Sequence, residues 1–165
     1  VVITAQLLGT DVSANCYITI LKNSDMSIVL KDNSSYVIYD NFICGISPSS
    51  NTVSAVKEQI NAPNVKLFKD NEELNNTDNV STGTVVKMYD DNNNEIDSLT
   101  VVVVGDINGD GEATLTDSSK ILNYLIKKEE FGEIELLAAD VNADGEVNNI
   151  DASMIMRYQA NKEQL

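Results

Sequence analysis

Residues 34–104 alternate between apolar and polar positions with a period of two, the pattern typical of half-buried β-strands. Clusters of Asn, Asp, Ser and Gly, such as DDNNNE at 90–95, separate the alternating runs and predict turns. One segment differs: VSAVKEQI has helical spacing, Asn51 or Thr52 is placed to cap it, and Pro63 follows its end. The alternating runs lie at 35–46, 65–68, 85–89 and 98–104.

This pattern predicts a small α+β module at residues 34–104, built from one strand, one helix and then three strands. Residues 1–33 contain further alternation, including CYITIL at 16–21, which predicts two or three more strands. These strands belong either to the same module or to the tail of a preceding one. Because the chain begins without Met, we expect a fragment or mature segment of a longer protein.

The periodicity changes at Gly105, and from there the sequence repeats itself. DINGDGEATLTD at 106–117 recurs as DVNADGEVNNID at 140–151, with a period of 34 residues. Each copy runs into a segment with apolar residues at helical spacing, SSKILNYLIK or ASMIMRYQA. GEIELLAA at 132–139 predicts a short linking helix between them. We therefore expect residues 105–165 to form an all-α unit of two loop–helix repeats.

Composition narrows the possible partners. Asp and Glu number 26 against 11 Lys and Arg, so the net charge is −15 and the pI is about 4.1. This charge would repel nucleic acid and anionic membranes, and no apolar run is long enough to span a bilayer. The chain contains no His, which excludes His-based catalytic triads and His-ligated metal sites.

Two cysteines, Cys16 and Cys44, each lie in an alternating apolar run. Buried free thiols, which behave as small hydrophobic groups, are the favoured interpretation. A disulfide between the two is the alternative in a secreted protein, because the sequence does not give the distance between their Cα atoms.

Each repeated segment of twelve residues fits the calcium loop D-x-[DN]-x-[DN]-G with an acid at position twelve. Gly111 and Gly145 permit the sharp turn, and Glu112 and Glu146 offer backbone carbonyls. An all-oxygen set that reaches seven ligands favours Ca²⁺ over Mg²⁺, so we predict two Ca²⁺ ions. The alternative, an Asp/Asn-rich turn without metal, suits a lone motif better than two copies with matching ligand types. The predicted ligands are Asp106, Asn108, Asp110, Glu112, Thr114 and Asp117 in the first loop, and Asp140, Asn142, Asp144, Glu146, Asn148 and Asp151 in the second.

Two features depart from an ordinary EF-hand. Position twelve is Asp117 or Asp151 instead of Glu, and the first loop follows the β-branched run LTVVVV instead of a helix. This duplicated half-hand, with the GDINGDG entry and the D-x-x-x-I-[LM]-x-Y run of both helices, resembles a dockerin over residues 105–165. The resemblance implies docking on a cohesin module of a scaffoldin or cell-surface anchoring protein, outside a bacterial cell. Residues 34–104, with FICGI, TVSAVKEQI and SLTVVVVGD, more loosely resemble the X-type modules that often precede dockerins.

A helical wheel of the two repeated helices separates two apolar stripes. The first stripe predicts the shared core and consists of Ile121, Tyr124, Leu125, Ile155 and Tyr158. The second, strongest on the first helix, has no core left to fill and predicts an interface, or else packing on the preceding module. In dockerins the matching positions and the loop ends face cohesin. This resemblance implies a candidate docking surface formed by Leu115, Thr116, Leu122, Asn123, Ile126, Asn149, Ile150, Met156 and Arg157.

These observations favour a non-catalytic, calcium-stabilised docking module, a monomer when free. The resemblance implies that it helps to assemble an extracellular polysaccharide-degrading complex. A calcium sensor is the alternative binding function, but sensors open a groove between paired complete hands, and the first entering helix is missing here. An enzyme is the third candidate, because Glu72–Glu73 and Glu129–Glu130 resemble glycosidase acid pairs. Such charge runs are usually solvated, so we expect no catalysis. Without Trp, residues 1–104 are expected to act as a spacer or stabiliser and to bind no sugar.

Overall fold

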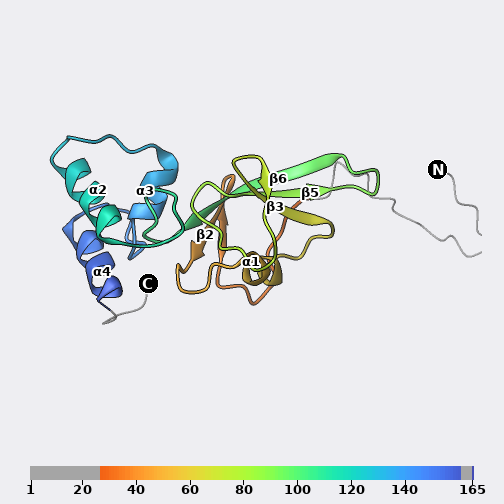
Figure 1. Ribbon diagram of the computed structural model, residues 1–165, viewed down its shortest axis with the longest axis horizontal. Helices are drawn as coiled ribbons and strands as arrows, with labels where there is room; N and C mark the ends of the chain where they lie inside the picture. Colours follow the sequence, from red (N-terminus) through yellow and green to blue (C-terminus); the bar gives the residue numbers. More distant parts are fainter. Residues whose placement is uncertain (1–26, 161–164) are drawn as a thin grey trace, which may run out of the picture.

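The computed structural model describes residues 27–160 and residue 165. Within this part of the chain, a six-stranded sheet with one helix is followed by three helices at the other end of an elongated molecule (Figure 1). The predicted α+β class is confirmed. The elements are β1 (Val37–Tyr39), β2 (Phe42–Ile46), α1 (Val53–Gln59), β3 (Val65–Lys69), β4 (Glu72–Glu73), β5 (Val85–Tyr89), β6 (Glu95–Val103), α2 (Leu115–Leu125), α3 (Glu133–Ala139) and α4 (Asn149–Gln159).

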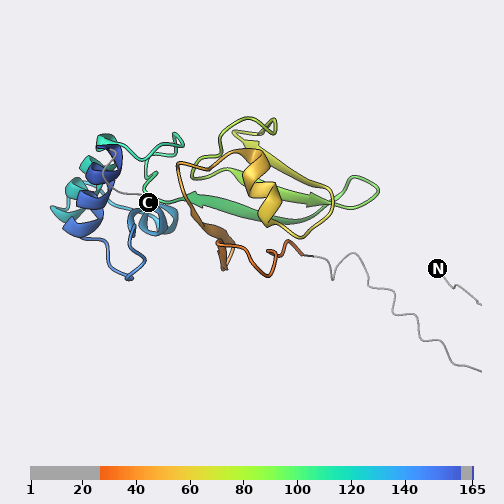
Figure 2. The same ribbon diagram turned by 90° about the horizontal axis from the view of Figure 1, so that it is seen from below.

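The sheet has the strand order β1-β2-β6-β5-β3-β4, in which only β2 and β6 pair in parallel. Thr52 caps α1, since its side chain accepts a hydrogen bond from the backbone N–H of Ala55 at 3.2 Å. α1 covers one face of the sheet (Figure 2) and buries Val53 and Val56 against it. The strand residues of this core follow the predicted alternation and include Ile43, Leu67, Val86, Met88, Leu99 and Val101.

The run at 35–46, predicted as one strand, forms the antiparallel hairpin β1–β2 instead. Tyr39 pairs with Phe42, and Asp40 has a left-handed φ of 52° at the turn. A two-residue turn keeps the alternation of apolar and polar residues in step, so the sequence pattern does not reveal the reversal. A second addition is the edge strand β4, whose two exposed glutamates have no apolar alternation to predict it.

The described residues before 34 pack on the sheet. Ile28 is buried in the sheet core, and Leu30 forms a β-bridge with Ile60. The predicted strand at 16–21, with Cys16, lies outside the described residues. Cys44, in β2, has a free thiol.

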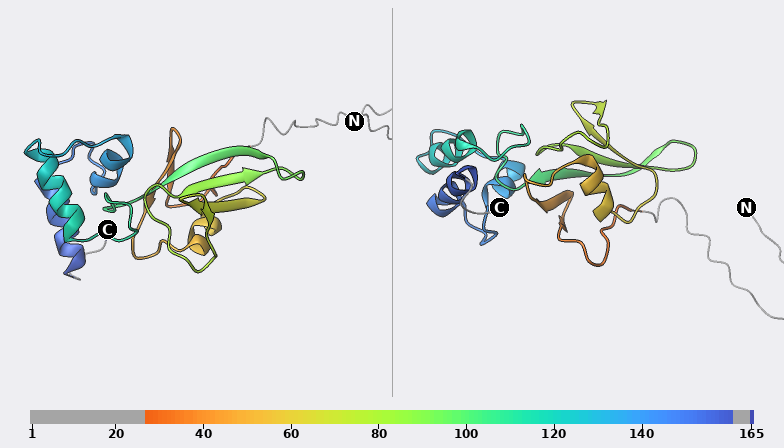
Figure 3. Two further views of the ribbon diagram at one scale, coloured as in Figure 1. Left: turned by 45° about the horizontal axis from the view of Figure 1, so that its top comes forward. Right: turned by 60° about the horizontal axis from the view of Figure 1, so that its bottom comes forward.

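α2 and α4 lie side by side (Figure 3), and the helical core forms between them. Ile121 and Ile155 are fully buried there, as predicted. The predicted core residues Leu125 and Tyr158 pack partly buried around them. Tyr124 differs, because its ring stacks on Phe131 with the centroids 4.5 Å apart. In the described chain, none of the helices is long and apolar enough to cross a membrane.

The sheet and the helices share a core at their junction. Val102, near the end of β6, is buried among the helical residues, and Phe42 and Cys44 of β2 pack against the same cluster. The backbone N–H of Gly105 donates to the carbonyl of Ala138 in α3 at 2.8 Å. β6 therefore carries the chain straight into the first repeated loop, and the two parts are in direct contact.

Candidate metal loops

The first loop begins where β6 ends, and its first acid organises the turn that follows. Oδ1 of Asp106 accepts hydrogen bonds from the backbone N–H groups of Gly109 at 2.8 Å and Asp110 at 3.0 Å. Oδ2 accepts from the N–H of Gly111 at 3.0 Å. Gly111 has a φ of 90°, a left-handed conformation in which a side chain would be strained. The loop backbone therefore wraps around the Asp106 carboxylate.

The side chains at positions three and five form successive Asx turns. Oδ1 of Asn108 accepts from the N–H of Asp110, and Oδ1 of Asp110 accepts from the N–H of Glu112, each at 2.9 Å. Nδ2 of Asn108 also donates to Oδ2 of Asp110 at 2.7 Å. All three side chains are exposed, so an ion can reach them from solvent.

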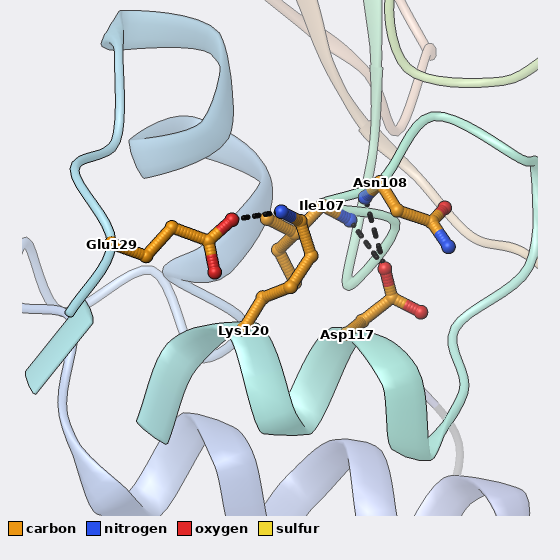
Figure 4. A network of polar contacts seen from close by, with 5 residues as sticks. All are labelled: Ile107, Asn108, Asp117, Lys120 and Glu129. Atoms are coloured by element: carbon orange, nitrogen blue, oxygen red, sulfur yellow. Dashed lines mark hydrogen bonds and ion pairs between the residues drawn. The ribbon is translucent and has the colours of Figure 1, made fainter. Parts of the chain in front are cut away.

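Asp117 closes the first loop at position twelve and also starts α2. Its Oδ1 accepts hydrogen bonds from the backbone N–H groups of Ile107 and Asn108, both at 3.0 Å (Figure 4). Its Oδ2 accepts from the N–H of Thr114 at 3.0 Å, and the two residues form the capping box of α2. The sequence predicted both residues as ligands but did not reveal that they cap the helix.

The second loop repeats this construction. The Asp140 carboxylate accepts from the backbone N–H groups of Asp144 at 3.0 Å and Gly145 at 2.9 Å. Asp151, at position twelve, is buried and forms the capping box of α4 with Asn148. The Asx turns of the first loop recur between Asn142 and Asp144 and between Asp144 and Glu146.

Both loops contain the oxygen types of a calcium site: carboxylates, amide oxygens and backbone carbonyls. Within the described residues, no three Asp, Glu or Cys side chains gather into a ready-made cluster. Carboxylates repel one another without a cation, and here they are held on backbone N–H groups of their own loop. The donor chemistry and the turn geometry therefore fit Ca²⁺, and the ion would have to supply the attraction that brings the carboxylates together.

The first acids of the two loops have different surroundings. Asp106 is fully buried, whereas its equivalent Asp140 is only partly buried. Burial raises the pKa of Asp106, and hydrogen bonds from the backbone N–H groups of Thr82, Gly111 and Gly109 oppose this rise. The carboxylate is thus already stripped of most of its water.

In the described part of the chain, three residues of the sheet module (β1–β6 with α1) donate hydrogen bonds to the first loop, and sequence reasoning missed all three as site residues. They lie between 24 and 60 positions from their partners in the chain, so no local pattern marks them. The contacts run from Nδ2 of Asn51 to the carbonyl of Gly111 (2.9 Å), from Nζ of Lys69 to the carbonyl of Gly109 (3.3 Å), and from the N–H of Thr82 to Oδ2 of Asp106 (2.8 Å).

The acid pairs considered as catalytic groups have structural partners. Lys120 forms an ion pair with Glu129, which ties α2 to the segment that follows it (Figure 4). Glu73 pairs with Lys66 of β3 at 3.0 Å, where both side chains are exposed. One member of each pair is thus engaged in an ion pair on the surface of the module.

The candidate docking surface is open to solvent at all nine of its residues. Its large apolar members Leu115, Leu122 and Ile126 are 54%, 40% and 60% exposed, and Ile150 and Met156 are 56% and 40% exposed. The alternative that the second stripe of the first helix packs on the preceding module is therefore wrong. The helical core is formed by other residues of α2 and α4, including Ile121 and Ile155, on the faces opposite this surface.

Comparison with known proteins gives a match for one part of this chain. Residues 104–158 match the family model of the dockerin type I domain. No curated protein and no solved structure matches the chain. The match begins at residue 104, so the resemblance of residues 34–104 to X-type modules remains a prediction. The matched residues 104–158 include both repeated loops and nearly all of helices α2 and α4. The match therefore supports a dockerin at this end of the molecule.

Proposed function

We propose that residues 104–158 are a non-catalytic, calcium-dependent docking domain that binds a cohesin module of a scaffoldin or cell-surface anchoring protein. The observation that carries this proposal is the apolar stripe of α2, which is exposed while the core beside it is complete. Exposed apolar side chains that have no core to fill usually mark a binding surface. The match to the dockerin type I domain supplies the class of partner.

Two Ca²⁺ ions would hold this surface in shape. Position twelve of each loop is also the third residue of α2 or α4, so an ion bound there joins the loop to the start of a docking helix. The residues that follow the ligands, Leu115–Thr116 and Asn149–Ile150, are exposed at the two helix starts. Loss of calcium would therefore displace the surface that faces the partner.

We further propose one dominant binding orientation, led by α2. A half-turn of the duplicated unit would place Asn149, Met156 and Ala160 where Leu115, Leu122 and Ile126 had been. The first set is smaller and more polar, so the two orientations offer the partner different chemistry. Met156 and Arg157 would then lie at the periphery of the interface.

Calcium has a permanent structural role in this proposal. A sensor opens a groove between two complete helix–loop–helix hands when calcium binds. Here the first loop follows strand β6, so there is no entering helix to swing away. The groove that a sensor would open is instead the packed core around Ile121 and Ile155.

The domain would attach its parent protein to an extracellular bacterial complex that degrades polysaccharides, with the sheet module as a stiff spacer or stabiliser. The shared core around Val102 and the direct junction at Gly105 support a stiff connection.

A capture experiment with the full chain tests the proposal. Immobilised type I cohesin modules of several sequence groups are incubated with the protein in calcium, in magnesium alone, and in excess chelator. We expect at least one cohesin to retain the protein in calcium and to release it in chelator. Failure of a broad cohesin panel to retain a calcium-loaded, folded protein would contradict the docking function.

A further inference from the structure

The duplicated loops provide an internal comparison. They share the same ligand types, the same glycine turn and a capping box each. Within residues 27–160, the sheet module donates hydrogen bonds to the first loop, from Asn51, Lys69 and Thr82, and none to the second. The buried face of Gly111 shows how close this contact is: an added Cβ would lie 3.3 Å from the carbonyl of Val80. At Gly145 in the second loop, an added Cβ would have no atom within 4 Å.

We infer that the sheet module holds the backbone of the first loop and its first ligand, Asp106, in place before calcium arrives, so that the first site binds calcium more tightly than the second. This inference rests on the proposed calcium-binding function and adds that the two sites are unequal. Asn51 and Thr82 are positioning residues in it, because they act on the loop backbone and on a ligand, and not on the ion.

The uncharged side-chain amide of Asn51 holds the backbone of the loop against the sheet module. Its side chain is almost fully buried, and Nδ2 donates both to the carbonyl of Val80 in the sheet module and to the carbonyl of Gly111 in the loop. One amide group therefore joins the two backbones where the loop turns. This bond fixes the loop backbone when the sheet module folds. Calcium binding therefore does not have to provide the free energy that is needed to order this part of the loop.

Thr82 acts on the first ligand itself. Its backbone N–H donates to Oδ2 of Asp106, which adds a fourth N–H to the three donated by the loop. The carboxylate of Asp140 accepts hydrogen bonds from two N–H groups, both within its own loop. Asp106 is thus fixed in orientation and already shielded from water, and both effects lower the free energy that calcium must provide.

The two loops also differ in sequence at their fourth position. It is Gly109 in the first loop and Ala143 in the second, both with a left-handed φ. A Cβ on Gly109 would lie 3.0 Å from the carbonyl of Thr82. Alanine therefore fits this position of the loop itself, and the contact with the sheet module is what favours glycine in the first copy.

Calcium titration calorimetry of the full chain separates the two sites. Asp144→Ala removes an exposed ligand of the second loop and leaves the first to be measured, and Asp110→Ala does the reverse. We expect the first site to bind at least about tenfold more tightly than the second, because it is pre-ordered. Adding Asn51→Leu should weaken the first site about tenfold, because the buried carbonyl of Gly111 loses its donor, and leave the second unchanged.

Val56→Ala is the matched control, since it weakens the same module from its apolar core without touching the loop. If Asn51→Leu fails to fold, Gly109→Ala disturbs the contact of the same loop with the carbonyl of Thr82, and Ala143→Gly is its counterpart in the second loop. Equal affinities at the two sites, an Asn51→Leu effect shared by both sites, or an equal effect of Val56→Ala would overturn the inference. No calcium binding at either site would instead refute the calcium-loop proposal on which it rests.

Discussion

Asp117 is both a predicted calcium ligand and part of the capping box of α2. It is buried and satisfies three backbone N–H groups, whereas Asp110 is exposed and satisfies one. We expect Asp117→Ala to lower the free energy of unfolding in calcium by about 3 kcal/mol more than Asp110→Ala does, because it removes the helix cap and leaves buried donors unsatisfied as well as removing a predicted ligand. Chemical unfolding of both variants in calcium checks this, and equal losses from the two variants would refute the capping role.

Leu122 and Met156 form a matched pair on the candidate docking surface, because both are 40% exposed and occupy the same position in the two repeats. Leu122→Glu should reduce cohesin affinity at least about a hundredfold, because it places a charge at the centre of the α2 stripe. Met156→Glu should reduce it about tenfold. Equal losses, or full binding by the Leu122 variant, would show that the surface is wrongly placed. Unchanged calcium-dependent circular dichroism confirms that both variants fold.

Cys44 offers a test of the junction between the two parts. Burial against the helical core raises the pKa of its thiol, so the folded protein keeps the thiol protonated to higher pH than the unfolded chain does. In Cys16→Ser, where Cys44 is the single thiol, we expect the pH midpoint of alkylation by iodoacetamide to lie higher in the folded protein than in denaturant. A midpoint equal to that of the unfolded chain would mean that Cys44 is exposed.

At the residue scale, the sequence indicates which side chains can act as metal ligands, but not which distant residues contact them. The spacing of Asp106, Asn108 and Asp110 indicated oxygen ligands, because alternate positions in a short turn lie close together whatever surrounds them. The contacts of Asn51 and Thr82 with the loop could not be predicted, because they depend on how two distant segments pack. The sequence indicates Asn51 as a candidate helix cap, a role that Thr52 fills in the structure.

At the scale of elements, we expect the stability of helices α2 and α4 to depend on the repeated loops, and that of the sheet to depend on its own core. α2 and α4 have 11 residues each, a length at which an isolated helix is marginal in water. We expect excess chelator to lower the helical circular dichroism while the signal of the sheet persists, since α1 and the strands have their own core. Thermal melting monitored at a helix wavelength, with magnesium as the control ion, measures this. An unchanged helical signal in chelator would contradict it.

The elements themselves were largely predictable where periodicity was unambiguous. The linking helix expected at 132–139 is α3, and the helix after Thr52 is α1. The hairpin within 35–46 was missed because a two-residue turn preserves alternation, and β4 because two residues are too few to show any period. Both errors lie beside tight turns, at Asp40 and at Asp70–Asn71, whose backbone conformation the pattern of side-chain burial does not reveal.

At the scale of the whole molecule, the sheet and the helical part are joined by apolar packing as well as by the chain. Val102 belongs to the helical core although it lies in β6, and Asn51 reaches from the sheet module into the first loop. The sequence indicated direct succession, because no linker separates LTVVVV from Gly105, but it did not show that the core crosses the junction. The helical part that carries the candidate metal loops and the candidate docking surface is therefore packed directly against the sheet.

We expect each of the two repeated loops to bind one calcium ion. Native mass spectrometry of the full chain tests it most directly, because it counts bound ions in the folded protein. We predict two Ca²⁺ per chain in calcium, one in Asp110→Ala and one in Asp144→Ala, and none after chelation. A folded wild-type protein that retains no Ca²⁺, or that binds Mg²⁺ equally well at both loops, would contradict the account.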